Sequence, residues 1–346
     1  MAQPYYSPMT VQTGQVPSTQ TNFTKLSFPT DARFKTIGNG GHVSNSSGFD
    51  IRPYSDSALT TPLTYELVYF NASTGQFEMH VLIPSLSDGY VTYFGYGDTG
   101  ITTDGSSTSA WDSNFKGVWH LKDGTTLSGS ESTASNKTLS FINTPTATSG
   151  QIDGAGSFAS ASSQRATASL DISAFTAITF SAWVNATSFP NAYNTVGISN
   201  ASTRFVELYV KSTGKLAIFI QNPAKSYDGT GSHTLSTATW YLLHAVYDST
   251  NGLIGYVNGA SDGTASAGTA LSISGLTGVD VATDPINAGR FWNGKQDELR
   301  VSNVARSPNW ITTEYNNQNA PGTFETLGTE VATGLGGSTS NMFLVM

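Results

Sequence analysis

The stretch GKQDELRVSNVARSPNWITTEYNNQNAP, residues 294–321, joins a strand pattern to a helix pattern and decides the fold. Its first part carries an Asp–Glu pair inside a β-strand pattern. Ser307 then suits a helix N-cap, and Pro308 suits the first helical position. Three aromatic or aliphatic residues follow at helical spacing on one face: Trp310, Ile311 and Tyr315. We therefore expect a closing strand, followed by one short helix whose aromatic face packs on the edge of a sheet.

Strand patterns also fill the segment before this stretch. The stretch ITFSAWVN, residues 178–185, has the alternating pattern of a strand. Ile178 and every second residue after it are expected on one face, and Trp183 is expected on the other. Similar runs, separated by turn clusters such as KSTG and STNG, are FVELYV (205–210), LAIFIQN (216–222), WYLLHAVYD (240–248) and LIGYVNG (253–259). This spacing of short alternating strands predicts an all-β fold in which two sheets pack as a sandwich.

Composition divides the chain into four segments. Residues 1–22, rich in Gln, Ser, Thr and Pro, predict an extended N-terminal arm, and residues 23–105 predict a small antiparallel β-domain. A Gly/Ser/Thr/Asp linker precedes Trp111, so the larger sandwich is expected over residues 111–330. Residues 331–346, VATGLGGSTSNMFLVM, predict a flexible C-terminal tail.

The charge and cysteine content exclude several classes of function. The 346 residues carry a formal net charge of −8 and 16 Lys+Arg, so we expect no surface for nucleic acid or anionic membranes. The chain has no cysteine, which excludes disulfides, thiolate metal sites and Cys nucleophiles. The N-terminus lacks a secretory signal pattern, and no apolar run approaches the ~18 residues that span a bilayer. We therefore expect no membrane insertion.

Residues 111–330 resemble the LamG-like members of the concanavalin A-like jelly rolls. Four pieces carry the resemblance: GVWHL (117–121), GSFASASSQRATASLDISAFTAITFSAWVN (156–185), TWYLLHAVYD with GYVNG (239–259), and the segment that ends in the opening stretch (287–321). The preceding segment resembles a β-rich family of unknown function that often precedes such jelly rolls, through GFDIRPYSD (48–56) and VTYFGYGD (91–98). The resemblance implies a small antiparallel β-domain followed by a two-sheet jelly roll, as in phage virion proteins of the tail, fibre or head-decoration kind.

The Asp–Glu pair does not predict catalysis. In the resembled family, the Asp-Glu-Leu-Arg-Val strand closes the sandwich. Adjacent residues of a strand point to opposite faces, so Asp297 and Glu298 are not expected to act on one bond. A glycosidase needs two carboxylates at ~5–10 Å, and FVELYV offers only a lone Glu207 beside Tyr209 on its face. We therefore expect that the protein is not an enzyme.

No metal is required by the sequence, although Ca²⁺ is a candidate. Some LamG-like modules bind this ion, and hard cations take six to eight oxygen ligands. The candidate ligands are Asp297 and Asn303, and Asp280 with Asp284 is a weaker alternative. The structural alternative pairs Asp297 with Arg300 or nearby backbone. The histidines at 80, 120 and 244 lack metal-ligand spacing, and we expect them to pack in the core or at its edge.

Sugar binding is the chemistry that remains. Lectin-like sandwiches stack an aromatic ring on a pyranose and bind its hydroxyls with Asn, Asp and Gln. The candidate ligand-binding residues lie in three loop patterns and are Tyr193, Asn194, Asn222, Tyr227, Asp228 and Trp292. Packing is the alternative role for Trp292. Five residues are expected to be structural: Trp183, Trp240, Arg300, Trp310 and Tyr315.

These observations favour a phage virion surface protein whose jelly roll binds host or environmental glycans weakly and in many copies. The expected partners are other virion proteins of the capsid or tail and, as a homo-oligomer, further copies of the chain. One alternative is a purely structural decoration or fibre protein that binds no glycan. Another is a secreted bacterial protein, at an extracellular location, that binds or cleaves glycans.

Overall fold

The computed structural model describes residues 3–122, 125–200, 206–221, 224–228, 231–265, 276–284 and 289–334. The regular secondary structure of the described chain consists mainly of β-strands, as the strand patterns predict. It divides into two compact units. The first comprises residues 1–15, 21–110 and 320–346, and the second comprises residues 16–20 and 111–319.

The first unit is built from two antiparallel sheets. One has the order β22-β1-β6-β3, with β23 also paired to β1, and the other has the order β2-β5-β4. The strands are β1 (Tyr5–Val11), β2 (Gln20–Ser27), β3 (Arg52–Tyr54), β4 (Tyr65–Asn71), β5 (Gln76–Leu86), β6 (Val91–Tyr96), β22 (Glu325–Leu327) and β23 (Val331–Ala332). Short helices are the 3₁₀ turns Ala32–Phe34, Ile37–Asn39 and Thr108–Ala110, and the α-helical turn α2 (Pro321–Phe324).

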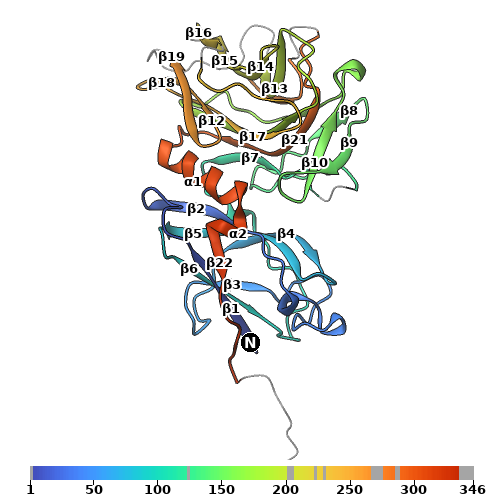
Figure 1. Cartoon of the computed structure of the whole chain (residues 1–346), viewed down its shortest axis with the longest axis vertical. Coiled ribbons are helices and arrows are strands. Elements are labelled where there is room, and N and C mark those ends of the chain that lie inside the picture. The colour runs from blue at the N-terminus through green and yellow to red at the C-terminus, as the bar shows by residue number, and fades with distance from the viewer. Residues whose placement is uncertain are drawn as a thin grey trace, which may run out of the picture. The chain divides into compact units, whose positions relative to one another are not determined.

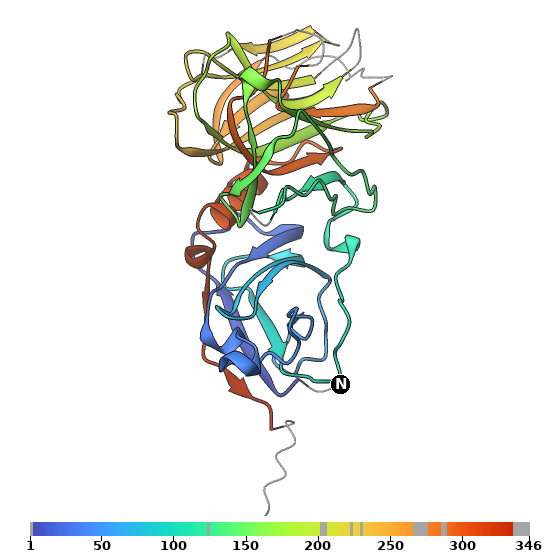
Figure 2. The same ribbon diagram turned by 90° about the vertical axis from the view of Figure 1, so that its right-hand side faces the viewer.

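Strand β1 corrects the prediction of an extended arm over residues 1–22. Residues 5–11 pair antiparallel with both β6 and β22, and both views show the dark-blue β1 beside the red β22 (Figures 1 and 2). Burial alternates along the strand, with Ser7, Met9 and Val11 inside. The Pro and Ser content of the segment concealed this period-two pattern.

The chain after helix α1 also belongs to the first unit. Residues 320–334 were predicted to be the end of the sandwich and the start of a flexible tail. Instead, β22 and β23 pair with β1, and Glu325 of β22 forms a fully buried ion pair with Lys25 of β2. Sheet pairing satisfies the backbone of these residues. Residues 335–346, the rest of the predicted tail, lie outside the described residues.

Two sheets form the second unit. Within the described residues, one sheet has the order β19-β18-β17-β12-β21-β10-β9, with β7 paired to β21, and the other has the order β16-β15-β14-β13-β20-β11-β8 (Figure 1). The strands are β7 (Phe115–Trp119), β8 (Ser140–Ile142), β9 (Thr146–Ser149), β10 (Gly154–Phe158), β11 (Arg165–Ala168), β12 (Ile178–Ala186), β13 (Tyr193–Asn200), β14 (Val206–Lys211), β15 (Leu216–Gln221), β16 (Ala224–Asp228), β17 (Trp240–Asp248), β18 (Gly252–Val257), β19 (Ala260–Ala265), β20 (Gly278–Val281) and β21 (Gly294–Ser302). A 3₁₀ turn covers Ser160–Ser162.

The core of the second unit lies between these sheets. Phe180 and Val184 of β12, Leu208 of β14 and Val281 of β20 belong to one cluster of buried side chains, so both sheets contribute to it. The β12 residues in this cluster are Ile178, Phe180, Ala182, Val184 and Ala186. The predicted alternation of this strand is therefore confirmed, and the unit is an all-β sandwich of two sheets.

Helix α1 (Pro308–Asn319) begins at the predicted residue. The backbone N–H of Trp310 donates a hydrogen bond to Oγ of Ser307 at 3.2 Å, so Ser307 is the N-cap of the helix. Trp310 and Ile311 are buried, as the helical spacing predicts. The helix is marked α1 in Figure 1.

Removal of this cap should cost a small amount of stability. We expect Ser307→Ala to lower the free energy of unfolding by about 1 kcal/mol, because one backbone donor of the first turn loses its acceptor. Urea unfolding followed by tryptophan fluorescence measures the change. Thr237→Ala, at an exposed loop position, is the control and should stay within about 0.5 kcal/mol of the parent chain. Equal stability of both variants would contradict a role for the cap.

Candidate functional site

The Asp–Glu pair of the opening stretch lies at a β-bulge. In the pairing of β21 with β12, Asp297 lies opposite Trp183 and Arg300 lies opposite Ser181, so the register shifts between them. Glu298 has φ of +50°, a left-handed conformation that is uncommon for a residue with a side chain. The bulge inserts one extra residue and interrupts the alternation of faces.

Because of the bulge, both acidic side chains lie on the face that carries α1. Trp183, the cross-strand partner of Asp297, donates its indole N–H to Gln318 of α1 at 2.7 Å. Glu298 accepts two hydrogen bonds from Arg300, which in turn reaches Glu314 of α1. The expectation of opposite faces was therefore wrong, since strict alternation does not hold across a bulge.

Glu298 belongs to a buried chain of charged groups. Arg300 donates to Glu298 at 2.6 Å and to Glu314 at 2.8 Å, and Glu314 contacts Nε2 of His244 at 3.0 Å. Nδ1 of His120 lies 2.5 Å from the other oxygen of Glu298. Burial alone would raise the pKa of Glu314, but the hydrogen bond to His244 and the charge of Arg300 lower this pKa to about 2. The group is therefore a fixed ionic support for α1.

The residues expected to be structural surround this chain of charges. Tyr315 packs against Trp183, with ring centroids 6.0 Å apart and ring planes inclined by 33°. The Arg306 guanidinium lies 4.0 Å from the Trp310 ring. Trp240 is half-buried at the start of β17, opposite Asn185, and its structural role stays a prediction. The three predicted core histidines each contact a glutamate: His80 with Glu78, His120 with Glu298 and His244 with Glu314.

The two predicted calcium ligands, Asp297 and Asn303, contact different parts of the chain. Asp297 is fully buried, and its Oδ2 accepts the backbone N–H groups of Gln151 and Ile152, each at 2.9 Å. The backbone N–H of Asn303 donates to Asn114 at 3.0 Å. Among the described residues, Asp297 belongs to no group of three or more His, Asp or Glu side chains gathered at metal-binding distance. These contacts match the structural alternative, in which Asp297 holds nearby backbone.

The outer face of the seven-stranded sheet carries a different set of polar groups. Val206, Leu208 and Val210 of β14 point into the core. The residues between and after them, Glu207, Tyr209 and Lys211, therefore lie on the outer face. Tyr193 of β13 lies directly opposite Lys211 in the register, so it shares that face.

Tyr193 lies among cations and a second aromatic ring. The Arg290 guanidinium is 4.5 Å from the centroid of its ring, and the Lys211 ammonium is 5.7 Å from it. Tyr209 meets the ring edge-on at 4.8 Å. Tyr193 itself is half-buried. We call Tyr193, Glu207, Tyr209, Lys211, Asp284 and Arg290 the outer-face cluster.

Two carboxyl groups meet at Arg290 in this cluster. Nη1 of Arg290 lies 3.2 Å from Oδ2 of Asp284 and 3.9 Å from Oε2 of Glu207. Glu207 is 97 % buried, and its carboxyl group lies beside that of Asp284, with which it shares a hydrogen bond. Burial, and next the charge of Asp284, raise the pKa of Glu207 to about 8, although Arg290 opposes this rise. The raised pKa favours the protonated form of Glu207 near neutral pH, and this form can donate a hydrogen bond.

This pair was not predicted from the sequence. Glu207 was noted only as a lone carboxylate, and Asp284 only as a weak cation ligand. Their meeting depends on the loop after β20, where Asp284 donates its backbone N–H to the carbonyl of Arg290 at 3.1 Å. The alternation of FVELYV, with a charged residue between core positions, was the one available signal.

The other predicted sugar-binding residues divide into three groups. Asn194 and Trp292 are fully buried, with their side-chain N–H groups donated to the carbonyls of Val210 and Lys295, so their predicted ligand-binding role is corrected to packing. Tyr227 and Asp228 lie on β16, opposite Ile218 and Ala217 of β15. Asn222 lies outside the described residues.

The second unit has the fold of a two-sheet β-sandwich. In agreement, residues 153–312 match the family described as the concanavalin A-like lectin/glucanases superfamily (Laminin_G_3). Comparison with curated protein sequences gives no significant match. In the described part of the chain, we find no helix with the length and apolar content needed to cross a membrane.

Comparison with solved structures gives matches of low sequence identity that cover part of this chain. Domain 4 of AbnA, an extracellular arabinanase from Geobacillus stearothermophilus solved with arabinotriose, is 17 % identical over 57 % of this chain and 97 % of its own, with a TM-score of 0.46. The receptor-binding domain of botulinum neurotoxin mosaic serotype C/D is 14 % identical over 59 % of this chain, with a TM-score of 0.48. The binding domain of Paraclostridial Mosquitocidal Protein 1 is 11 % identical over 58 %, with a TM-score of 0.48. The similarity spans about half of each toxin domain, 51 % and 52 %.

Proposed function

We propose that the second unit binds glycans through the outer-face cluster, without catalysis. The observation that carries this proposal is Tyr193, a half-buried ring held between Arg290 and Lys211 on the outer face of a lectin-like sandwich. The cluster offers the half-buried ring of Tyr193 and the cationic N–H donors of Arg290 and Lys211, which suit the faces and hydroxyls of sugars.

The test is binding of the full chain to a panel of bacterial surface polysaccharides, immobilised at high density so that weak sites act together. We expect saturable binding that Tyr193→Ala weakens at least tenfold and that Arg290→Gln also weakens. Tyr90→Ala, at a half-buried tyrosine of the first unit, is the matched control and should bind like the parent chain. Absence of binding to every polysaccharide would contradict the proposal and favour the purely structural alternative.

Calcium enters the same experiment as a variable. The binding assay is run with calcium and again with a chelator, because we propose that the outer-face cluster needs no metal. A loss of binding on chelation would instead assign an ion to the second unit, and Asp297→Asn would then test the predicted ligand. Calorimetric titration of the chain with Ca²⁺ gives a readout that does not depend on the glycan.

A second candidate function is glycan cleavage, which the Glu207–Asp284 pair favours. Glycosidases use two carboxyl groups ~5–10 Å apart, one of which protonates the leaving group while the other assists the attack. Release of reducing ends from each bound polysaccharide measures this activity. Glu207→Gln would abolish turnover but keep binding if the pair were catalytic. Binding without release of reducing ends would support the non-catalytic proposal.

We further propose that the chain works on the surface of a phage particle, where many copies present the second unit to host or environmental glycans. The weak single sites of a lectin-like face gain avidity in such an array. The proposed partners are capsid or tail proteins and other copies of the chain, and an extracellular bacterial location is the alternative. Mass spectrometry of purified particles and size-exclusion chromatography with light scattering test the two parts of this proposal.

A further inference from the structure

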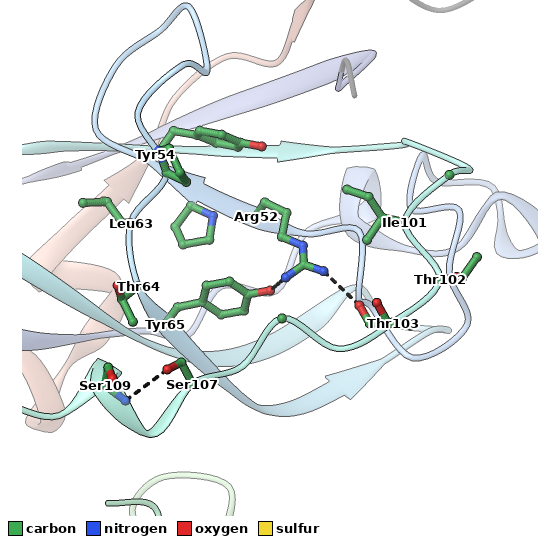
Figure 3. Close-up of a pocket in the computed structure, with 14 residues that line it drawn as sticks. Arg52, Tyr54, Leu63, Thr64, Tyr65, Ile101, Thr102, Thr103, Ser107 and Ser109 are labelled. Carbon is green, nitrogen blue, oxygen red and sulfur yellow. Dashed lines mark hydrogen bonds between the residues drawn. The ribbon is translucent and has the colours of Figure 1, made fainter. Parts of the chain in front are cut away.

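The first unit contains a cavity of about 700 Å³ that belongs to none of the sites above. It is formed by β3, by the segment that leads into β4, and by the loop over residues 100–109. Figure 3 shows Tyr54 and Tyr65 on two sides of it, with the side chain of Arg52 between them. Its volume lies within the ~300–1,000 Å³ range of small-ligand pockets.

Arg52 is held in place at the wall of this cavity. It donates from Nη2 to the carbonyl of Thr103 at 2.9 Å and from Nη1 to the hydroxyl of Tyr65. Its guanidinium lies 5.4 Å from the centroid of the Tyr65 ring. The loop approaches so closely that a Cβ at Gly105 would collide with Nη1. The arginine is therefore positioned before any ligand arrives, with other N–H groups left to donate.

Charge at the cavity comes from this one group. Among the fourteen described residues that line it, Arg52 alone carries a full charge. The nearby Asp56 and Asp104 do not line the cavity, and they accept backbone N–H groups of Thr61 at 2.7 Å and Ser106 at 2.8 Å. The remaining wall is aromatic, apolar or hydroxylic, as the side chains of Tyr54, Leu63, Ile101, Thr102 and Ser107 illustrate.

We propose that this cavity binds an acidic sugar residue of a polysaccharide, namely a uronic acid. Its carboxylate accepts charge-assisted hydrogen bonds from Arg52. The apolar face of its ring packs on the half-buried Tyr54, and threonine and serine hydroxyls bind its hydroxyl groups. The site lies in the first unit and does not depend on the outer-face cluster.

Isothermal titration of the full chain with a trimer of galacturonic acid, and with the neutral galactose trimer, tests this inference. We expect saturable binding of the acidic trimer and at least tenfold weaker binding of the neutral one. Arg52→Gln should weaken binding of the acidic trimer at least tenfold, since glutamine removes the charge that pairs with the carboxylate. Tyr54→Ala is a second variant, which leaves the Arg52 contacts in place and should weaken binding severalfold. Circular dichroism checks that both variants are folded.

Tyr193→Ala separates this site from the outer-face cluster. It should bind the acidic trimer like the parent chain. Three results would overturn the inference: no saturable binding by the parent chain, equal affinity for the neutral trimer, or unchanged affinity of a folded Arg52→Gln. If Tyr193→Ala alone lost binding of the acidic trimer, the inference about the cavity would also be overturned. That result would support the outer-face cluster as a glycan site.

Discussion

Replacement of Arg300 by methionine is expected to destabilise the second unit by about 3–5 kcal/mol. Arg300 lies between the buried carboxylates of Glu298 and Glu314, with side-chain exposures of 5 %, 1 % and 5 %. Methionine leaves both carboxylates in a site that water does not reach, and an uncompensated buried charge carries a cost of this size. Urea unfolding followed by tryptophan fluorescence measures the loss without adding salt.

Two controls distinguish the charge effect from a packing effect. Arg165→Met makes the same change at a half-buried arginine of β11 and should cost less than about 1 kcal/mol. The triple variant Arg300→Met, Glu298→Gln, Glu314→Gln removes all three charges and should recover part of the stability. If Arg300→Met costs no more than the Arg165 control, the chain of charges does not support α1.

The same network sets an acid limit on stability. Because the pKa of Glu314 is lowered to about 2 from an ordinary 4.5, its contribution is present above pH 4.5 and is lost as the pH falls toward 2. In Arg300→Met the carboxyl loses one cause of the lowered pKa, so this part of the acid dependence should shrink.

Glu207→Gln is expected to stabilise the protein at alkaline pH and to change little at pH 5. The pKa of Glu207 is raised from 4.5 to about 8, so its neutral form contributes stability that is lost as the pH rises from about 4.5 through about 8. Each unit of such a shift corresponds to ~1.4 kcal/mol. Glutamine does not ionise, so at pH 9 the variant should be more stable than the parent chain by up to about 5 kcal/mol.

Urea unfolding at pH 5, 7 and 9 tests this prediction. The difference between Glu207→Gln and the parent chain should grow at each step. Thr237→Ala, at an exposed loop position without a titratable group, is the control and should show no such growth. A constant difference at all three pH values would mean that the pKa of Glu207 is not raised. Glu207 would then be ionised at neutral pH and could not donate a hydrogen bond.

The fold followed from the sequence where the signal was local. The period-two pattern of ITFSAWVN predicted which β12 side chains enter the core, and the Ser307–Pro308 start predicted helix α1. Both depend on residues close in the chain. Pairing of β1 with β22 depends on residues more than 300 positions apart, such as Met9 with Leu327, and no local pattern reports such a partner.

The site was predictable in part for the same reason. Tyr193 was singled out because an aromatic residue in a polar loop pattern is typical of sugar binding, and its role in binding stays a prediction. Glu207, Asp284 and Arg290 were missed as a group because β14 and the loop after β20 bring them together only in the folded sheet. Asp297 and Glu298 were assigned to opposite faces because a bulge at a non-glycine residue has no clear sequence pattern.

The most direct test of the central claim, glycan binding by the outer face of the seven-stranded sheet, is a hydrogen-exchange footprint. The full chain is compared with and without a saturating oligosaccharide from the polysaccharide that binds best. The account predicts slower amide exchange in β13, β14 and residues 289–292, and no change in α1 or β21. Protection that spares β13 and β14, or a footprint confined to the first unit, would contradict it.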